Sequence, residues 1–239
     1  MALDYLTEAQ QRQLLKTIRS RSGHLARRDA AWVALLIETG LRIGEFAQLT
    51  VADARTALKT GWLFVPAEYR KGVQVVRKGQ KQTRRFDHKV SLYQPERAAL
   101  AELLLVHELM VDGQQELFDT SPLIYSRNAA PLSVRSYQAR LQEWCALAGL
   151  AVHASPHTLR HTCAMNILRV STADNPLSLV TLKLGHVNHR TALIYIEMRD
   201  QERVQAELDK VGEQRSQAGA KPRIRTKALR GLFDSRSTH

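Results

Sequence analysis

The segment ASPHTLRHTCAMNILRV, residues 154–170, places three basic side chains at the start of a predicted helix. Ser155 is a preferred N-cap residue and Pro156 suits the first helical position. His157, Arg160 and His161 then fall at positions i, i+3 and i+4, which share one helix face. The helix dipole and the free backbone N–H groups favour an anion at this end. The segment therefore indicates a phosphate site, and a solvated helix end is the plainer alternative.

Two other segments contain side chains suited to phosphate chemistry. In TGLRIGE, Arg42 follows a glycine break and Glu45 lies one turn later, where it can hold the guanidinium. Arginine binds phosphate oxygens bidentately, although a surface Arg–Glu pair is the plainer interpretation. In LGHVNHRTALIYIE, His186 follows a helix stop and Tyr195 lies in an apolar run. A tyrosine in such a run is normally a core residue, so Tyr195 gains a chemical role only beside the other groups.

Lys78 could reach into a groove from the tip of a predicted hairpin. Lys78 stands in RKGQKQTRRF, where a strand would enter a glycine turn, and this strand–turn–strand layout favours it. The plainer interpretation of this segment is a basic hairpin that coats DNA or blunts a sheet edge.

The elements that must position these residues are mostly helical. Capping signals and apolar periodicity predict helices at about 5–18, 27–40, 95–110, 132–150, 154–170, 176–186 and 201–211. Segments rich in Val, Phe and Thr predict strands within 61–69, 73–78 and 83–92, with a turn at 79–82. We therefore predict a mainly α fold with a small antiparallel β-sheet (α+β).

Composition limits the partners. The 239 residues include 35 Lys and Arg against 23 Asp and Glu, a net charge of +12 with a pI near 10.1. Such a balance indicates a polyanionic partner, most often nucleic acid. The two cysteines match no zinc pattern, and the chain has neither a signal-peptide layout nor an apolar run of membrane-span length. We expect a cytoplasmic, nucleoid-associated protein that binds double-stranded DNA, with no membrane association.

The words TGLRIGE, RKGQK, HTLRHT, LGH and ALIYIE, in this order, resemble the tyrosine recombinase (phage integrase) family. The resemblance spans about Tyr5 to Val211. It implies a catalytic domain at 1–212, followed by a basic flexible tail at 213–239. It also implies an enzyme that transfers DNA strands without a metal, ATP or other cofactor.

The resemblance implies that Tyr195 attacks the scissile phosphate and forms a 3′-phosphotyrosine. Arg42 and Arg160 would bind the non-bridging oxygens, and His186 would donate a hydrogen bond to the phosphate.

The resemblance also implies which residues transfer protons. His157 would accept the tyrosine proton, and Lys78 would protonate the leaving 5′-oxygen. Lys71, which directly follows the strand-like LFVPAEYR as the lysine does in this family, and Lys81 are rivals of Lys78 for this role. Glu45 and His161 would be supporting residues that orient the others.

The resemblance also implies partners and leaves alternatives. Recombination between two sites implies a homo-tetramer on DNA; the free protein is expected to be a monomer, and an accessory DNA-bending protein is a candidate further partner. Only 41 residues precede Arg42, as in minimal members that lack an N-terminal core-binding domain, so we expect weak, salt-dependent DNA binding aided by the tail. The alternatives are a decayed integrase acting as a regulator, and a type IB topoisomerase or telomere resolvase. An RNA-binding module is disfavoured, since its signatures are missing from the sequence.

Overall fold

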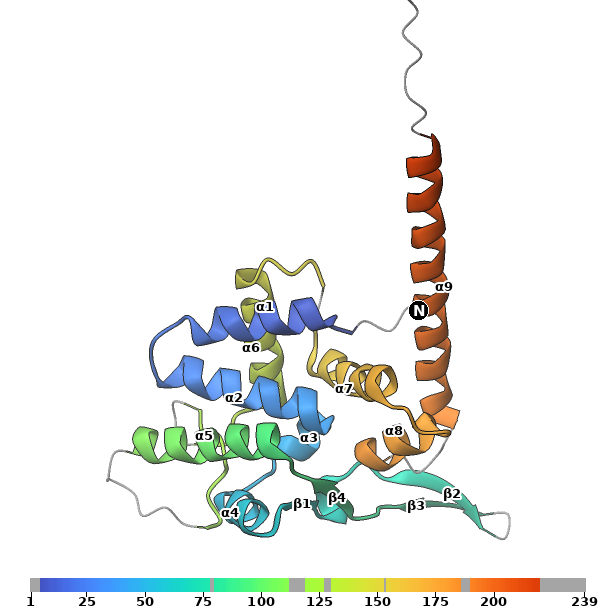
Figure 1. The fold of residues 1–239 in the computed structure, drawn as a ribbon. Helices are drawn as coiled ribbons and strands as arrows, with labels where there is room; N and C mark the ends of the chain where they lie inside the picture. The colour runs from blue at the N-terminus through green and yellow to red at the C-terminus, as the bar shows by residue number, and fades with distance from the viewer. Residues whose placement is uncertain are drawn as a thin grey trace, which may run out of the picture. The chain divides into compact units, whose positions relative to one another are not determined.

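The computed structural model describes residues 5–77, 80–111, 119–126, 130–152, 154–185 and 190–219 (Figure 1). Its helices are α1 (Glu8–Arg19), α2 (His24–Thr39), α3 (Ile43–Phe46), α4 (Val51–Thr60), α5 (Gln94–Val111), α6 (Val134–Leu147), α7 (Pro156–Val170), α8 (Pro176–Leu184) and α9 (Arg190–Gly219). Its strands are β1 (Trp62–Val65), β2 (Val73–Arg77), β3 (Gln80–Arg84) and β4 (His88–Ser91). The predicted fold class, mainly α with antiparallel strands, is confirmed.

Helix α2 is the centre of the main core, and it packs against α1, α5 and α7 (Figure 1). A buried carboxylate fastens it to α6. Asp29 on α2 accepts hydrogen bonds from the indole N–H groups of Trp32 and Trp144, and it pairs with the guanidinium groups of Arg28 and Arg140. Since Asp29 is fully buried, these donors replace the water that its charge would otherwise need.

An aromatic cluster fixes the short helix α3 against the same core. The ring of Tyr137 on α6 makes edge contacts with Trp32 at 5.2 Å and with Phe46 of α3 at 5.7 Å between centroids. Such contacts are favourable beyond the buried area of the rings. They hold the backbone that carries Arg42.

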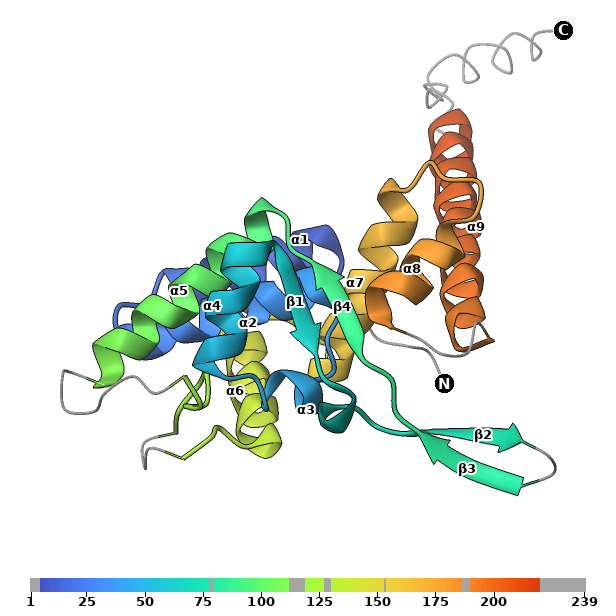
Figure 2. The same cartoon turned by 90° about the horizontal axis from the view of Figure 1, so that it is seen from below.

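The strands form two separate antiparallel pairs rather than the one sheet that was predicted. β1 pairs with β4 and β2 pairs with β3, and the β2–β3 hairpin projects away from the first pair (Figure 2). The predicted turn at 79–82 is wrong, because β3 already begins at Gln80. Lys78 and Gly79 lie outside the described residues.

A second, smaller core joins α7, α8 and the start of α9. Its buried members include Met165, Leu168, Val180, Leu184 and Tyr195. The ring of Tyr195 is therefore held by packing.

Helix α9 is continuous from Arg190 to Gly219, where the sequence predicted a short segment and then a helix at 201–211. Residues 213–219 of the predicted flexible tail are therefore helical. Residues 220–239 of that tail lie outside the described residues. The chain divides into compact units at 1–199 and 200–239, and Tyr195 belongs to the first. No helix in the described residues is both long and apolar enough to span a membrane.

Candidate active site

Arg160 is held by the ends of two helices. Its side chain is buried, and its guanidinium donates to the carbonyl of Gly40 and, at 2.9 Å, to that of Leu184. These carbonyls lie at the C-terminal ends of α2 and α8, where the helix dipole favours a cation. Both helices end in a left-handed glycine, Gly40 at φ 64° and Gly185 at φ 61°, a conformation that glycine adopts without strain. The two glycine helix ends that the sequence indicated therefore supply the carbonyl groups that bind Arg160.

Glu45 holds two arginines. Its carboxylate accepts from the Arg42 guanidinium at 2.9 Å, from the Arg42 backbone N–H at 3.2 Å, and from Arg70 Nε at 3.2 Å. Burial opposes ionisation of Glu45, but Arg42 and then Arg70 outweigh it, so the pKa of this carboxyl lies below its usual value. Glu45 is therefore a carboxylate at neutral pH and fixes the orientation of Arg42.

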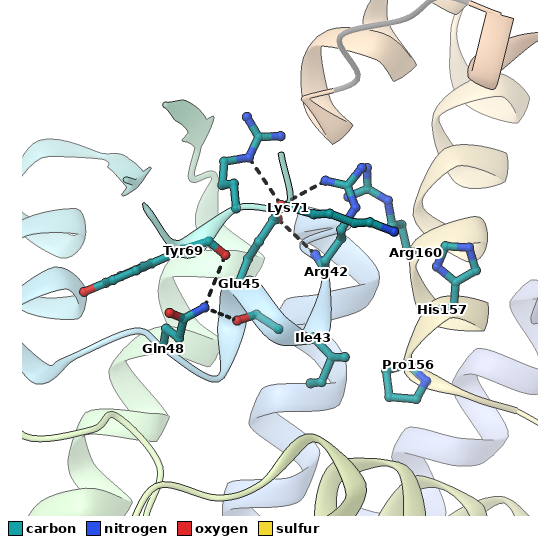
Figure 3. A pocket seen from close by; sticks show the side chains of 11 residues that line it. Arg42, Ile43, Glu45, Gln48, Tyr69, Lys71, Pro156, His157 and Arg160 are labelled. Atoms are coloured by element: carbon teal, nitrogen blue, oxygen red, sulfur yellow. Dashed lines mark hydrogen bonds and ion pairs between the residues drawn. The ribbon is translucent and has the colours of Figure 1, made fainter. Parts of the chain in front are cut away.

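Several of these groups open into one cleft of about 450 Å³ (Figure 3). Arg42, Glu45 and Lys71 line it from one side, and His157 and Arg160 line it from α7. In Figure 3 the Lys71 side chain reaches across the cleft toward Arg160 and His157. The cleft, which Arg70 also lines, thus joins three guanidinium groups, an ammonium group and an imidazole, a set that suits a phosphodiester.

Burial and the positive charges of the cleft keep His157 neutral. Burial and, to a smaller extent, the charge of Arg42 lower the pKa of Arg160 to about 10, so the group remains charged at pH 7. Burial lowers the pKa of His157, and the charges of Arg160 and Arg42 act in the same direction. The site is therefore positive through its arginines, and His157 holds a free ring nitrogen when no anion is bound.

Tyr195 meets α7 through His161. The Tyr195 hydroxyl and His161 Nδ1 are 2.9 Å apart, and both side chains are buried, at 2 % and 5 % exposure. Burial raises the pKa of Tyr195, and the nearby charges of Arg160 and Arg42 oppose this rise. The phenol is thus protonated at neutral pH in this arrangement, and its electrostatic environment already includes the guanidinium groups of Arg160 and Arg42.

The structure brings together most of the residues singled out in the sequence. Arg42, Glu45, His157 and Arg160 meet at the cleft, and His161 links the same helix to Tyr195. Lys78 and His186 lie outside the described residues, so their predicted roles stay predictions. Of the two rival lysines, Lys71 lines the cleft, whereas Lys81 lies in β3 opposite Val76.

Sequence reasoning missed Arg70 and His88. Arg70 is buried and donates to Phe86 O and Gly185 O, both at 2.8 Å, besides its contact with Glu45. His88 is buried beside it and pairs through Nε2 with Lys183 O at 3.1 Å. No local pattern marks these residues, because each contact joins positions far apart in the chain.

Comparison with known proteins identifies the family. The family model described as "Phage integrase family" matches residues 4–202. The chain belongs to this family.

Sequence relatives of this integrase-family chain are tyrosine recombinases. It is 34 % identical over 203 residues to the tyrosine recombinase XerC of Shewanella amazonensis, covering 85 % of this chain and 56 % of the relative. It is 32 % identical over 174 residues to XerC of Neisseria meningitidis serogroup B, covering 73 % and 49 %. The chain thus spans about half the length of these relatives.

Solved structures share the fold. The crystal structure of XerA recombinase matches with a TM-score of 0.60 and 22 % identity, over 84 % of this chain and 64 % of that one. XerH site-specific recombinase, bound to a palindromic difH substrate after cleavage, matches with a TM-score of 0.62 and 20 % identity, over 87 % and 53 %. This integrase-family chain therefore has the fold of a tyrosine recombinase catalytic domain.

Proposed function

We propose that the protein is a site-specific DNA recombinase that cuts and rejoins double-stranded DNA through a 3′-phosphotyrosine intermediate. The observation that carries the proposal is the cleft in which Arg42, Arg160, His157 and Lys71 converge, with Tyr195 paired to the helix that bears two of them. The family membership and the basic charge of the chain support it.

The proposed reaction is a transesterification. The Tyr195 oxygen bonds to the scissile phosphorus as its proton leaves, and the bond from phosphorus to the 5′-oxygen breaks. Arg42 and Arg160 bind the non-bridging oxygens, and each such preorganised donor contributes about 100- to 1000-fold in rate. The phosphotyrosine conserves the energy of the broken bond, so the reverse attack by a 5′-hydroxyl rejoins the strand. His157 borders the cleft on the phosphate side, and His186 keeps its proposed role as a hydrogen-bond donor.

We assign protonation of the leaving 5′-oxygen to Lys71 in preference to Lys78. The support is that Lys71 lines the same cleft as Arg42 and Arg160. A substrate with sulfur in place of the bridging 5′-oxygen tests the assignment, because a thiolate leaves without a proton. Lys71→Ala should cleave the oxygen substrate about 100- to 10,000-fold more slowly and the sulfur substrate at nearly the wild-type rate. If Lys78→Ala or Lys81→Ala shows this pattern instead, the assignment moves to that lysine.

The proposed partner is double-stranded DNA. The protein would assemble on two DNA sites as a homo-tetramer, at the nucleoid, and an accessory DNA-bending protein is a candidate further partner. The second half of α9 supports assembly, since Val204, Leu208 and Val211 form an exposed apolar stripe at i, i+4 and i+7 spacing. We propose that this stripe docks on a neighbouring subunit.

A nicked suicide duplex tests the whole proposal. The protein is incubated in EDTA with duplexes from its neighbouring genome, and a covalent protein–DNA band is sought on a denaturing gel. Tyr195→Phe should abolish the band, while Tyr93→Phe, an exposed tyrosine, should retain it. Failure to form the band on any duplex would favour a non-catalytic DNA-binding regulator. Relaxation of any supercoiled plasmid without site preference would favour a topoisomerase.

A further inference from the structure

The Tyr195 hydroxyl contacts a basic group, His161, to which the sequence pattern gave only a supporting role. His161 Nδ1 lies 2.9 Å from the hydroxyl oxygen, a normal hydrogen-bond distance. Both groups are nearly removed from solvent, so bulk water is poorly placed to take the proton at this point.

The imidazole of His161 lies between the nucleophile and the cleft. The His157 ring is edge-on to the His161 ring with 4.3 Å between centroids, and the Tyr195 ring is 5.5 Å from the His161 ring. His157 itself is exposed and lines the cleft. Within the described residues, His161 Nε2 has no hydrogen-bond partner, so nothing there fixes the tautomer against accepting a proton at Nδ1.

We propose that His161 is a catalytic residue that accepts the proton of Tyr195 when the phosphate is attacked. The inference rests on the proposed recombinase function and transfers to His161 the role that the sequence indicated for His157. The O–H bond of Tyr195 breaks as its oxygen bonds to phosphorus, and the proton moves to His161 Nδ1 to give an imidazolium. In the rejoining step the same proton returns to the tyrosine oxygen as the bond from phosphorus to tyrosine breaks.

The electrostatics of the site agree with a base that becomes effective only with substrate. Burial, followed by smaller electrostatic effects of His157 and Arg160, lowers the pKa of His161 to about 4. A phosphodiester bound at Arg160 brings a negative charge that offsets these contributions and favours the imidazolium. The free protein therefore holds Tyr195 protonated.

The test is single-turnover cleavage of a suicide duplex by His161→Asn, whose amide can hold the tyrosine hydroxyl without accepting its proton. Cleavage should fall about 100- to 10,000-fold, the usual contribution of a general base. His107→Asn is the matched control, because His107 is another buried histidine but lies on α5, where it bonds to Leu123 O. This control should cleave at the wild-type rate.

A more acidic nucleophile separates proton transfer from positioning. With 2,3-difluorotyrosine at position 195 the phenol ionises more readily, so the loss caused by His161→Asn should shrink. The sulfur-leaving-group substrate should leave this loss unchanged, because His161 acts on the nucleophile.

Two results would overturn the inference. One is cleavage by His161→Asn within about threefold of wild type. The other is an equal loss with tyrosine and difluorotyrosine, which would make His161 only a positioning residue. Failure of the proposed recombinase function would look different, since wild type itself would then form no covalent complex.

Discussion

Lowering the pH from 7 to 5 is expected to destabilise the folded chain through His88. Burial lowers the pKa of His88, Arg70 acts in the same direction, Glu45 opposes it, and Arg160 and Arg42 add smaller lowering effects, so that the pKa is about 4. An unfolded histidine has a pKa near 6.5, so between pH 6.5 and 4 the unfolded chain binds more protons than the folded chain. The stabilisation is complete above pH 6.5 and is lost as the pH falls toward 4.

The magnitude follows from this window. From pH 6.5 to pH 5 the loss is about 1.5 units at 1.4 kcal/mol each, or about 2 kcal/mol. His161, whose pKa burial also lowers to about 4, should add a similar loss over the same range. A domain of ordinary stability has about 5–15 kcal/mol in total, so the effect is readily measured.

Urea denaturation followed by tryptophan fluorescence, at pH 7 and pH 5 and constant ionic strength, provides the assay. His88→Gln keeps a hydrogen-bond donor but cannot titrate, so it should reduce the pH-dependent loss by about 2 kcal/mol. His24→Gln changes an exposed histidine and should leave the loss intact. Equal pH dependence of His88→Gln and wild type would refute the reasoning.

Substitutions at three further buried positions, Asp29, Gly40 and Arg70, have predictable effects on stability or cleavage. Asp29→Ala should lower the free energy of unfolding by about 3–5 kcal/mol in urea denaturation, because it leaves buried guanidinium groups unpaired. Asp119→Ala, at an exposed ion pair, should cost at most about 1 kcal/mol. Gly40→Ala should cost about 1–3 kcal/mol and slow suicide-duplex cleavage, since its Cβ would meet a leucine side chain at 2.3 Å with φ at +64°. Arg70→Lys should slow cleavage about 10- to 100-fold without weakening DNA binding in a gel-shift assay, because a lysine cannot reproduce the planar fork that orients the carboxylate. Arg84→Lys, on the exposed side of β3, is its control, and a matching loss there would contradict that explanation.

Local signals predicted the helix ends well. Thr7 caps α1 and Ser155 caps α7, each with a capping box, and Gly40 and Gly185 end α2 and α8 in the left-handed conformation. These features depend on a few neighbouring residues, so a sequence pattern can contain them. The strand pairing was harder, because the β2–β3 register depends on where a turn falls within a basic, polar segment that offers several positions.

The sequence by itself determined the mainly α fold class, the ends of α2 and α8 and the start of α7, and it contains the candidate phosphate-binding residues, because spacing and residue type carry that information. Only the tertiary structure decided which side chains meet. It paired Tyr195 with His161 across 34 positions and brought Lys71 into the cleft. It also placed Arg70 between Glu45 and a carbonyl 115 residues away. The physical reason is that packing between α7, α8, α9 and the strands sets these distances, and no local periodicity records them.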